Sequence, residues 1–190
     1  MKLLLAAFPP ELGVLLEAPP PGWVVVCTEV GALAAAVATT RLLRELHPET
    51  VLFVGTCGSY DPMIPVGSLV SVSEVLATSI EELEGGAYRP SRERTRWSTQ
   101  VPLPLPPQVV VAPPAITATV EGAIILSRAG SLEHLELPGV LEACREGGIP
   151  CGAALVVANE VGPKAHEQWR ANHAACSAKL IQALVEAKVV

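Results

Sequence analysis

Six short apolar runs constrain the fold of this chain more than any other feature. They are rich in Val, Leu, Ile and Ala, and apolar residues alternate little with polar ones along them. The runs comprise residues 2–7, 23–28, 51–54, 67–73, 123–127 and 153–158. Because side chains of a strand alternate between the two faces of a sheet, a strand without alternation is buried on both faces. The runs therefore predict a sheet that is covered on both sides.

The segments between these runs fit the covering helices. Residues 29–46 form an Ala-rich amphipathic stretch that ends at His47-Pro48, and residues 139–147 end on two glycines. In the last segment, apolar and aromatic residues recur at helical spacing: Trp169, His173, Cys176, Leu180 and Leu184. The alternation of strands and helices predicts an α/β layered domain.

Residues 79–122 differ from the rest of the chain. Charged residues come first, and the sequence VPLPLPPQVVVAPP follows. Its prolines argue against a central strand or a helix interior. The segment lacks the contiguous apolar periodicity of a separate core, whereas half of the whole chain is apolar. We therefore expect one domain over residues 1–190, with an irregular excursion at about 79–122.

Charge and composition exclude several classes of partner. The net charge is −6, and the 13 basic residues form no stripe that could follow a phosphate backbone. We expect no nucleic-acid partner, and we interpret the cluster Arg89, Arg92, Arg94 and Arg96 as a solvated loop. No apolar run approaches the roughly 18 residues of a membrane span, and the opening MKLLLAAF lacks a cleavage site. We expect a protein without a membrane partner.

The five cysteines are odd in number and widely spaced. They are Cys27, Cys57, Cys144, Cys151 and Cys176. None forms the closely spaced pair that zinc and redox motifs use. We therefore expect reduced thiols in a cytoplasmic protein, with no metal and no cofactor. Cys57 is interpreted as a small packing residue.

Two stretches suggest chemistry. The run at 51–54 breaks into Gly55-Thr56-Cys57-Gly58-Ser59, and glycines at the carboxyl end of a strand let a ligand approach the backbone closely. We expect a glycine-rich turn at a binding site. Glu11 follows the first run, where Pro9-Pro10 prepares a helical turn whose positive end favours an ionised carboxylate. Glu11 could deprotonate water or merely cap the helix.

Four stretches, taken in order, resemble one known superfamily. They are MKLLLAAFPPELGVLL, VLFVGTCGSYDPMIPVGSLVSVSEV, LELPGVLEAC and IPCGAALVVANEVGPKAHEQW. They are similar to the nucleoside phosphorylases and nucleosidases, in the branch that contains methylthioadenosine/adenosylhomocysteine nucleosidase and futalosine hydrolase. Ser68 stands where Asp is usual in the second stretch. The Asn-x-Val-Gly motif followed by Trp169 is closest to futalosine hydrolases.

The resemblance implies a three-layer α/β sandwich with a mixed central sheet. It also implies a purine nucleoside as the ligand and a homodimer as the assembly. It assigns Glu11 to the attacking water and Glu136, beside Leu135, to the ribose hydroxyls. Asn159 would meet the purine, at N7 and at its 6-substituent. Thr56 would hold the water or the sugar, and the backbone near Gly55 and Gly58 would donate N–H groups. Trp169 could close the site or belong to the core.

Phe53 bears on whether the reaction is hydrolysis or phosphorolysis, and Asn159 bears on which purine is bound. Related phosphorylases bind phosphate with an arginine where Phe53 stands here, and Glu11 would repel phosphate, so hydrolysis is favoured. An Asn can donate to both N7 and a 6-oxo oxygen, so Asn159 suits a 6-oxopurine, with futalosine or a similar compound as substrate. Lys164 and His166 could pair with a substrate carboxylate, although a solvated loop is the preferred interpretation.

Two alternatives remain open at this stage. The protein could be a phosphate-dependent purine nucleoside phosphorylase, or a catalytically inactive homologue that binds purine nucleosides. The second arises because the segment before Leu135 is short, and we expect it to lack a helix and a strand that relatives carry. His134 is interpreted as a structural or surface residue.

Overall fold

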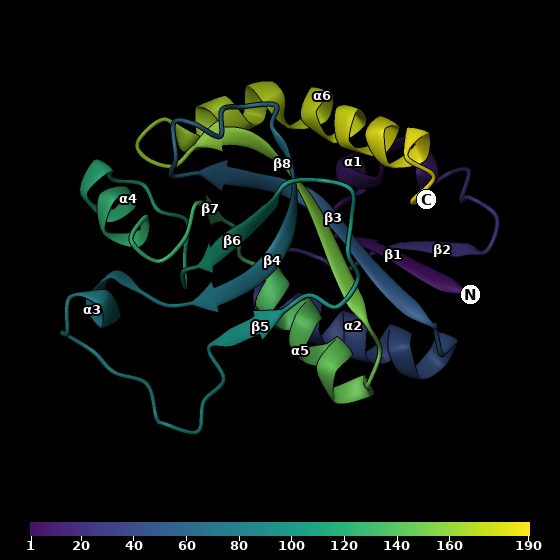
Figure 1. Ribbon diagram of the computed structural model, residues 1–190, viewed down its shortest axis with the longest axis horizontal. Helices are drawn as coiled ribbons and strands as arrows, with labels where there is room; N and C mark the ends of the chain where they lie inside the picture. The colour runs from purple at the N-terminus through teal and green to yellow at the C-terminus, as the bar shows by residue number, and fades with distance from the viewer.

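A sheet of eight strands lies between two layers of helices in the computed structural model, which describes residues 1–190 (Figure 1). The strands are β1 (Lys2–Ala6), β2 (Trp23–Cys27), β3 (Thr50–Ser59), β4 (Leu69–Ala77), β5 (Arg96–Ser98), β6 (Pro107–Ala112), β7 (Leu132–Glu133) and β8 (Cys151–Glu160). The helices are α1 (Pro9–Leu12), α2 (Ala32–Leu46), α3 (Ile80–Leu83), α4 (Val120–Leu126), α5 (Leu137–Gly147) and α6 (Ala165–Glu186), with a 3₁₀ turn η1 (Gly13–Leu15). Strand β8 is parallel to β3 and antiparallel to β4. The α/β class with a mixed sheet is thus confirmed.

Each face of the sheet carries its own apolar cluster. Leu3 and Leu5 of β1 pack with residues of α2 and α5, whereas Leu4 and Ala6 pack with residues of α1 and α6. Figure 1 shows α2 and α5 on one side of the sheet and α1 and α6 on the other. The strands are apolar at successive positions because both of their faces are buried. This is the pattern that the sequence predicted.

Five strands of the sheet close into a ring. The strand order is β2-β1-β3-β7-β6-β4-β5, and β8 pairs with both β3 and β4. The ring therefore runs β3, β8, β4, β6, β7 and back to β3. The short strand β7 completes it by pairing antiparallel with the end of β3, where Gly58 lies opposite Glu133. As a result, the residues that follow β7 lie beside the end of β3.

Strand β3 is longer than the sequence predicted. The expected turn at residues 55–59 is wrong, because the strand continues to Ser59 and is paired with β8 along its length. A β-bulge shifts the register between Cys57 and Gly58, so that Cys57 lies opposite Val157 but Gly58 lies opposite Asn159. A bulge of this kind bends a strand and redirects side chains without ending the ladder.

Residues 123–126 of the run at 123–127 lie in helix α4, so the prediction of a strand there is wrong. Thr119 caps this helix, because its Oγ1 accepts a hydrogen bond from the backbone N–H of Gly122 at 3.0 Å. A short apolar run does not distinguish a strand from a buried helix segment. Between residue 130 and Leu135, where we expected a helix and a strand of the relatives to be missing, the chain forms only the short strand β7.

The excursion at 79–122 contributes two strands to the sheet. Strand β6 lies between β4 and β7, so the argument against a central strand is wrong for residues 107–112. Pro107 stands at the first position of β6, where its missing N–H is tolerated. The description of residues 1–190 as one domain with an excursion stays a prediction.

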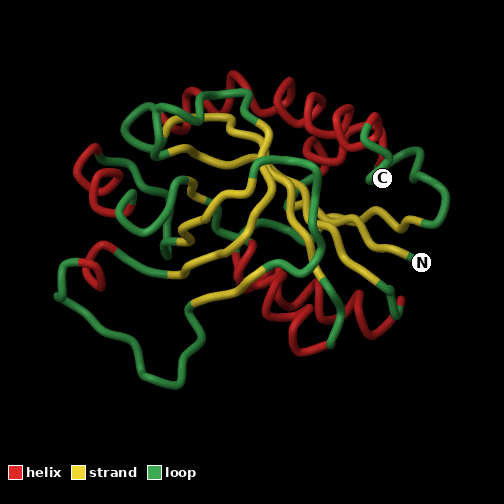
Figure 2. The backbone as a smooth tube through the Cα atoms, viewed as in Figure 1, coloured by secondary structure: helices red, strands yellow, loops and turns green.

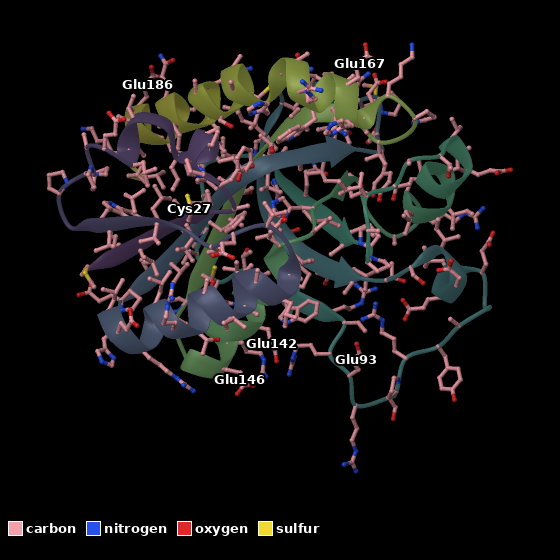
Figure 3. All side chains as sticks on the ribbon, turned by 180° about the vertical axis from the view of Figure 1, so that it is seen from behind. Cys27, Glu93, Glu142, Glu146, Glu167 and Glu186 are labelled. Atoms are coloured by element: carbon pink, nitrogen blue, oxygen red, sulfur yellow. The ribbon has the colours of Figure 1, made fainter.

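The loop between α3 and β5 projects from the body of the molecule (Figure 2). Arg89 donates to Glu82 at 2.7 Å and to Glu93 at 2.9 Å, and Arg94 lies 3.5 Å from Glu142 of α5. Figure 3 shows Glu93 in the loop and Glu142 on α5 in the same part of the molecule. Ion pairs at the protein surface, such as these partly and fully exposed ones, add little stability.

Helix α6 is the longest helix of the fold. Its buried residues include Cys176, Leu180 and Leu184, which confirms the helical spacing seen in the sequence. No helix combines the length and the apolar character needed to cross a membrane. All five cysteines are free thiols.

Replacing Gly139 with Ala is expected to destabilise the protein by about 3 kcal/mol or more. Helix α5 packs tightly against the backbone of α2 there, and an added methyl group would overlap the carbonyl oxygen of Ala32 and lie 2.9 Å from the backbone nitrogen of Ala36. Urea denaturation followed by circular dichroism measures the loss. Gly86→Ala is the matched control, because its methyl group would meet only ordinary contacts. Equal stabilities of the two variants would contradict this account of the packing.

Candidate active site

A cavity of about 420 Å³ opens at the carboxyl ends of β1, β3 and β8. These three strands are parallel, so their carboxyl ends meet at one edge of the sheet. Most of the predicted site residues line it: Glu11, Thr56, Gly58, Leu135, Glu136, Asn159 and Trp169. Gly55 does not line the cavity but lies directly behind Glu11, within β3. The structure thus brings together residues that are distant in the sequence.

Glu11 is a buried acid at the base of this cavity. Its side chain is only 3% exposed, and Pro9 and Pro10 open its helix as predicted. One carboxylate oxygen, Oε1, accepts hydrogen bonds from the backbone N–H of Thr56 at 2.7 Å and from Thr56 Oγ1 at 2.8 Å. The other oxygen accepts from the backbone N–H of Ala7 at 3.2 Å.

Burial raises the pKa of Glu11 to about 7, although the hydrogen bonds from Thr56 and Ala7 oppose the shift. The expectation that the helix end would favour the ionised form is therefore wrong in its net effect. Removing the carboxylate from water outweighs the donors around it. The result is an acid that changes protonation near neutral pH, which suits proton transfer.

Trp169 and Thr56 continue the hydrogen-bond network. The indole Nε1–H donates to Thr56 Oγ1 at 3.1 Å, so the hydroxyl proton of Thr56 is directed to Glu11. The indole ring also stacks on His173 with centroids 4.5 Å apart and contacts Phe8 at 5.6 Å. Trp169 thus lines the cavity and also packs against the core, as both interpretations of the sequence proposed.

Glu136 reaches the cavity from the start of α5. Its Oε1 accepts a hydrogen bond from the backbone N–H of Gly31 at 2.9 Å, just before α2, and the residue is 8% exposed. Its negative charge is one of the causes that raise the pKa of Glu11, and both residues line the same cavity. Leu135 lines the cavity beside it.

Asn159 ends the buried part of β8. Its Nδ2 donates to the carbonyl oxygen of Glu160 at 3.0 Å, which leaves Oδ1 and a second N–H for a ligand. Gly58 permits this position, because a methyl group there would lie 2.9 Å from Asn159 Nδ2 and 2.7 Å from Val161. The glycine is required by close packing rather than by a turn.

The sequence analysis missed the place of two residues in the cavity wall, Glu133 at the end of β7 and His134 directly after it. His134 is 5% exposed, so of its two interpretations, as a structural or a surface residue, the surface one is wrong. Glu133 accepts hydrogen bonds from the hydroxyl of Tyr60 at 2.5 Å and from the backbone N–H of Thr117 at 3.1 Å. A signal was present, because LEHLE places three ionisable residues within four positions.

Three further residues that the sequence analysis considered differ in their surroundings. Cys57 is 3% exposed, and burial raises the pKa of its thiol, so it stays protonated and fits the packing role. His166 lines the cavity, whereas Lys164 is exposed at the start of α6 and does not line it. Phe8, which we did not single out, also lines it.

Comparison with known proteins gives a family and a fold. The model of the phosphorylase superfamily matches residues 21–133. The futalosine hydrolase of Streptomyces coelicolor is 29% identical over 183 residues, which cover 85% of this chain and 77% of that protein. A 5′-methylthioadenosine/S-adenosylhomocysteine nucleosidase of a Marinomonas species is 34% identical over 58 residues, which cover 30% of this chain and 25% of that protein.

Solved structures share the architecture. The 5′-methylthioadenosine/S-adenosylhomocysteine nucleosidase of Helicobacter pylori, crystallised with butyl-thio-DADMe-Immucillin-A, superimposes with a TM-score of 0.82 at 16% identity over 97% of both chains. A mutant futalosine hydrolase of the same organism also gives 0.82 at 16% identity, over 97% of this chain and 98% of that one. At this identity the likeness concerns the fold alone.

Glu11→Gln is expected to gain stability relative to the wild type as the pH rises. The folded-state pKa of about 7 lies above the ordinary 4.5, so ionising the carboxyl weakens the folded state across that interval. The stability difference between variant and wild type should grow by up to about 3 kcal/mol between pH 4.5 and about pH 8. Urea denaturation at both pH values measures it. Glu17→Gln, at an exposed position, is the control, and a difference independent of pH for Glu11→Gln would contradict the raised pKa.

Proposed function

The chain belongs to the phosphorylase superfamily, and on that premise we propose that it is a purine nucleosidase. It hydrolyses the N-glycosidic bond of a 6-oxopurine nucleoside, futalosine or a similar compound, with a water molecule activated by Glu11. The observation that carries this proposal is the meeting of Glu11, Glu136 and Asn159 at one cavity. The similarity to the futalosine hydrolase of Streptomyces coelicolor supports the same substrate class.

The chemistry of the bond explains why these groups are needed together. When an N-glycosidic bond breaks, positive charge develops on the sugar and negative charge on the departing base. Carboxylates beside the sugar stabilise the positive charge, and a hydrogen-bond donor beside the base stabilises the negative one. Glu11 and Glu136 supply the first, and Asn159 supplies the second.

Glu11 is suited to the role of general base. A base works best when its pKa lies near the working pH, because it is then both available and strong enough. Burial gives Glu11 a pKa of about 7. Thr56 and Ala7 fix its carboxylate in place, and Thr56 is itself held by Trp169. The base is therefore preorganised as well as tuned.

Glu136 binds the ribose of the substrate, and Asn159 binds its purine. Glu136 keeps an oxygen that can accept hydrogen bonds from ribose hydroxyls, while Gly31 fixes the other. Asn159 can present its free N–H to N7 or to a 6-oxo oxygen of the purine. An amide cannot transfer a proton. Asn159 therefore stabilises the departing purine by a hydrogen bond and does not protonate it.

Hydrolysis is proposed over phosphorolysis because the cavity is unsuited to a dianion. Phe53, where related phosphorylases carry an arginine, is fully buried and packs edge-on against His134. The residues that line the cavity include Glu11, Glu133 and Glu136 but neither lysine nor arginine. Phosphate there would meet acidic side chains with no cation to balance it.

We also propose that the protein is a homodimer. Three apolar residues are exposed along one side of α2 and just before it. They are Val30, two residues before the helix, and Leu33 and Val37 within it, with exposed fractions of 68%, 80% and 65%. Val30 lines the cavity as well, and so does Ile116, which is 64% exposed. An apolar strip that continues into the rim of a site is typical of an interface that completes that site. The second copy would bury this strip.

Five free thiols support a reducing compartment. Four of them are buried, and none is paired with another in a disulfide. We therefore propose that the protein acts in the cytoplasm.

A panel of nucleosides tests the function. The wild type is incubated with futalosine, inosine, guanosine and adenosine, with and without phosphate, and the released bases are separated by chromatography. We expect release of hypoxanthine or guanine without phosphate, and a reduction of at least about 100-fold in Glu11→Gln, which lacks the base. A requirement for phosphate would indicate a phosphorylase. Saturable binding of the nucleosides without release of base would indicate an inactive homologue.

Asn159→Asp tests which purine base the site prefers. The carboxylate accepts hydrogen bonds and, in its ionised form, repels a 6-oxo oxygen, so the preference should move from 6-oxopurine toward 6-aminopurine nucleosides by about tenfold or more. The ratio of kcat/KM for inosine and adenosine measures this change. An unaltered ratio, or release of adenine alone by the wild type, would contradict the assigned role of Asn159.

Leu33→Glu is expected to convert a dimer into a monomer. The substitution places a charge in the middle of the apolar strip, where it would be desolvated in the interface. Light scattering coupled to size-exclusion chromatography measures the mass. Ile124→Glu, which alters an equally apolar but separate exposed position on α4, is the control. A monomeric wild type would overturn the proposed dimer.

A further inference from the structure

His134 occupies the cavity wall between the two carboxylates that the proposed function uses. It follows β7 directly, is 5% exposed and lines the cavity. Its ring meets the Phe53 ring at 87°, with centroids 5.2 Å apart. An imidazole held this firmly presents its two nitrogens in fixed directions, so the contacts of each nitrogen can be considered separately.

The Nδ1 atom faces Glu136. It accepts a hydrogen bond from the backbone N–H of Glu136 at 3.3 Å and lies 3.5 Å from Glu136 Oε2. A neutral imidazole has one donor and one acceptor nitrogen, so a ring that accepts at Nδ1 carries its hydrogen on Nε2. Burial lowers the pKa of His134, although the charge of Glu136 opposes the shift, and this favours the neutral ring.

The Nε2 atom faces Gly55, and so does Glu11. A methyl group added at Gly55 would lie 3.1 Å from His134 Nε2 and 3.4 Å from Glu11 Oε1. Both atoms therefore crowd the same point beside Gly55 and lie close to each other, and both residues line the cavity. A donor and an acceptor that lie this close at the wall of a cavity are the partners that a bridging water molecule in the cavity requires.

We propose that His134 is a positioning residue for Glu11, and that its Nε2–H donates through one water molecule in the cavity to the Glu11 carboxylate. This inference rests on the proposed function. The donor stabilises the ionised form of Glu11, which is the form that takes a proton from the attacking water. In the same arrangement, Nδ1 fixes the backbone at Glu136, so one ring couples the base to the residue assigned to the ribose.

The surroundings of Glu11 show why one more donor matters. The titratable groups near it are Glu136, whose charge raises the pKa of Glu11, and the thiols of Cys27 and Cys57. None of these stabilises a negative charge on Glu11. Only Thr56 and Ala7 donate to it directly. Removal of a further donor would raise the pKa of Glu11, so activity would require a higher pH.

Two substitutions separate the roles of the two ring nitrogens. The amide of Asn occupies the place of Nδ1 and can accept from Glu136, but it does not reach the position of Nε2. The amide of Gln extends to the place of Nε2 and can donate to the bridging water molecule. We expect His134→Gln to keep a kcat about tenfold higher than His134→Asn, with similar KM values for both. The acid limb of the pH profile should move upward by about one pH unit in His134→Asn and less in His134→Gln.

Other outcomes would overturn the proposal. If His134→Asn is the more active variant, the ring serves only to hold the backbone of Glu136. If both variants lose activity equally with no movement of the acid limb, the role of the ring is structural. Thermal denaturation of both variants shows whether either fails to fold.

A spectroscopic measurement on the folded protein decides the matter without turnover. The chain contains four histidines, so ¹⁵N spectra of the imidazole nitrogens can be resolved, and His134→Gln assigns the signal of His134. We expect the Nε2–H tautomer, and a change in the Nε2 signal in Glu11→Gln. A hydrogen on Nδ1, or no response to Glu11→Gln, would overturn the proposal. A wild type that releases no base from any nucleoside would contradict the proposed function instead, and these spectra would still test His134.

Discussion

The hydrogen bonds between Thr56 and Glu11 are the interaction on which the site depends. They join the short helix after β1 to the middle of β3, across a separation of 45 residues in the sequence. The backbone N–H of Thr56 and its hydroxyl both point to one carboxylate oxygen, and Trp169 fixes the hydroxyl from the other side. A buried carboxylate is tolerated only where such donors surround it. The position of Glu11 in the cavity therefore follows from the path of β3.

The closed ring of strands brings the second half of the site to the first. Strand β7 has only two residues, yet it pairs with both β3 and β6. That pairing places Glu133, His134 and Glu136 beside the end of β3. The backbone N–H of Gly31, before α2, then holds Glu136 in place. The cavity thus gathers acidic groups from distant segments without a cation among its lining residues, an electrostatic environment that favours developing positive charge.

The sequence predicted the layers and seven of the sixteen residues that line the cavity, because each depended on a strong local pattern. Unalternated apolar runs indicated doubly covered strands, and Glu11, Glu136 and Asn159 were identified through motifs in a familiar order. Features that depend on distant partners were missed. The pairing of β8 extends β3 through its glycines, the cap at Thr119 makes residues 120–126 a helix, and ring closure places β6 inside the sheet. The net pKa shift of Glu11 likewise depends on burial, which no local pattern shows.

Trp169 makes the site visible to fluorescence. The other two tryptophans lie elsewhere: Lys2 stands 5.2 Å over the ring of Trp23, and Trp97 donates to Glu142 at 2.6 Å. Only Trp169 lies at the cavity wall, where its indole shares the Thr56 hydroxyl with Glu11. Indole emission responds to the polarity and the charge near the ring. The occupancy of the cavity and the protonation of its buried acid can therefore be followed in the unlabelled protein, through the share of the tryptophan emission that Trp169 contributes.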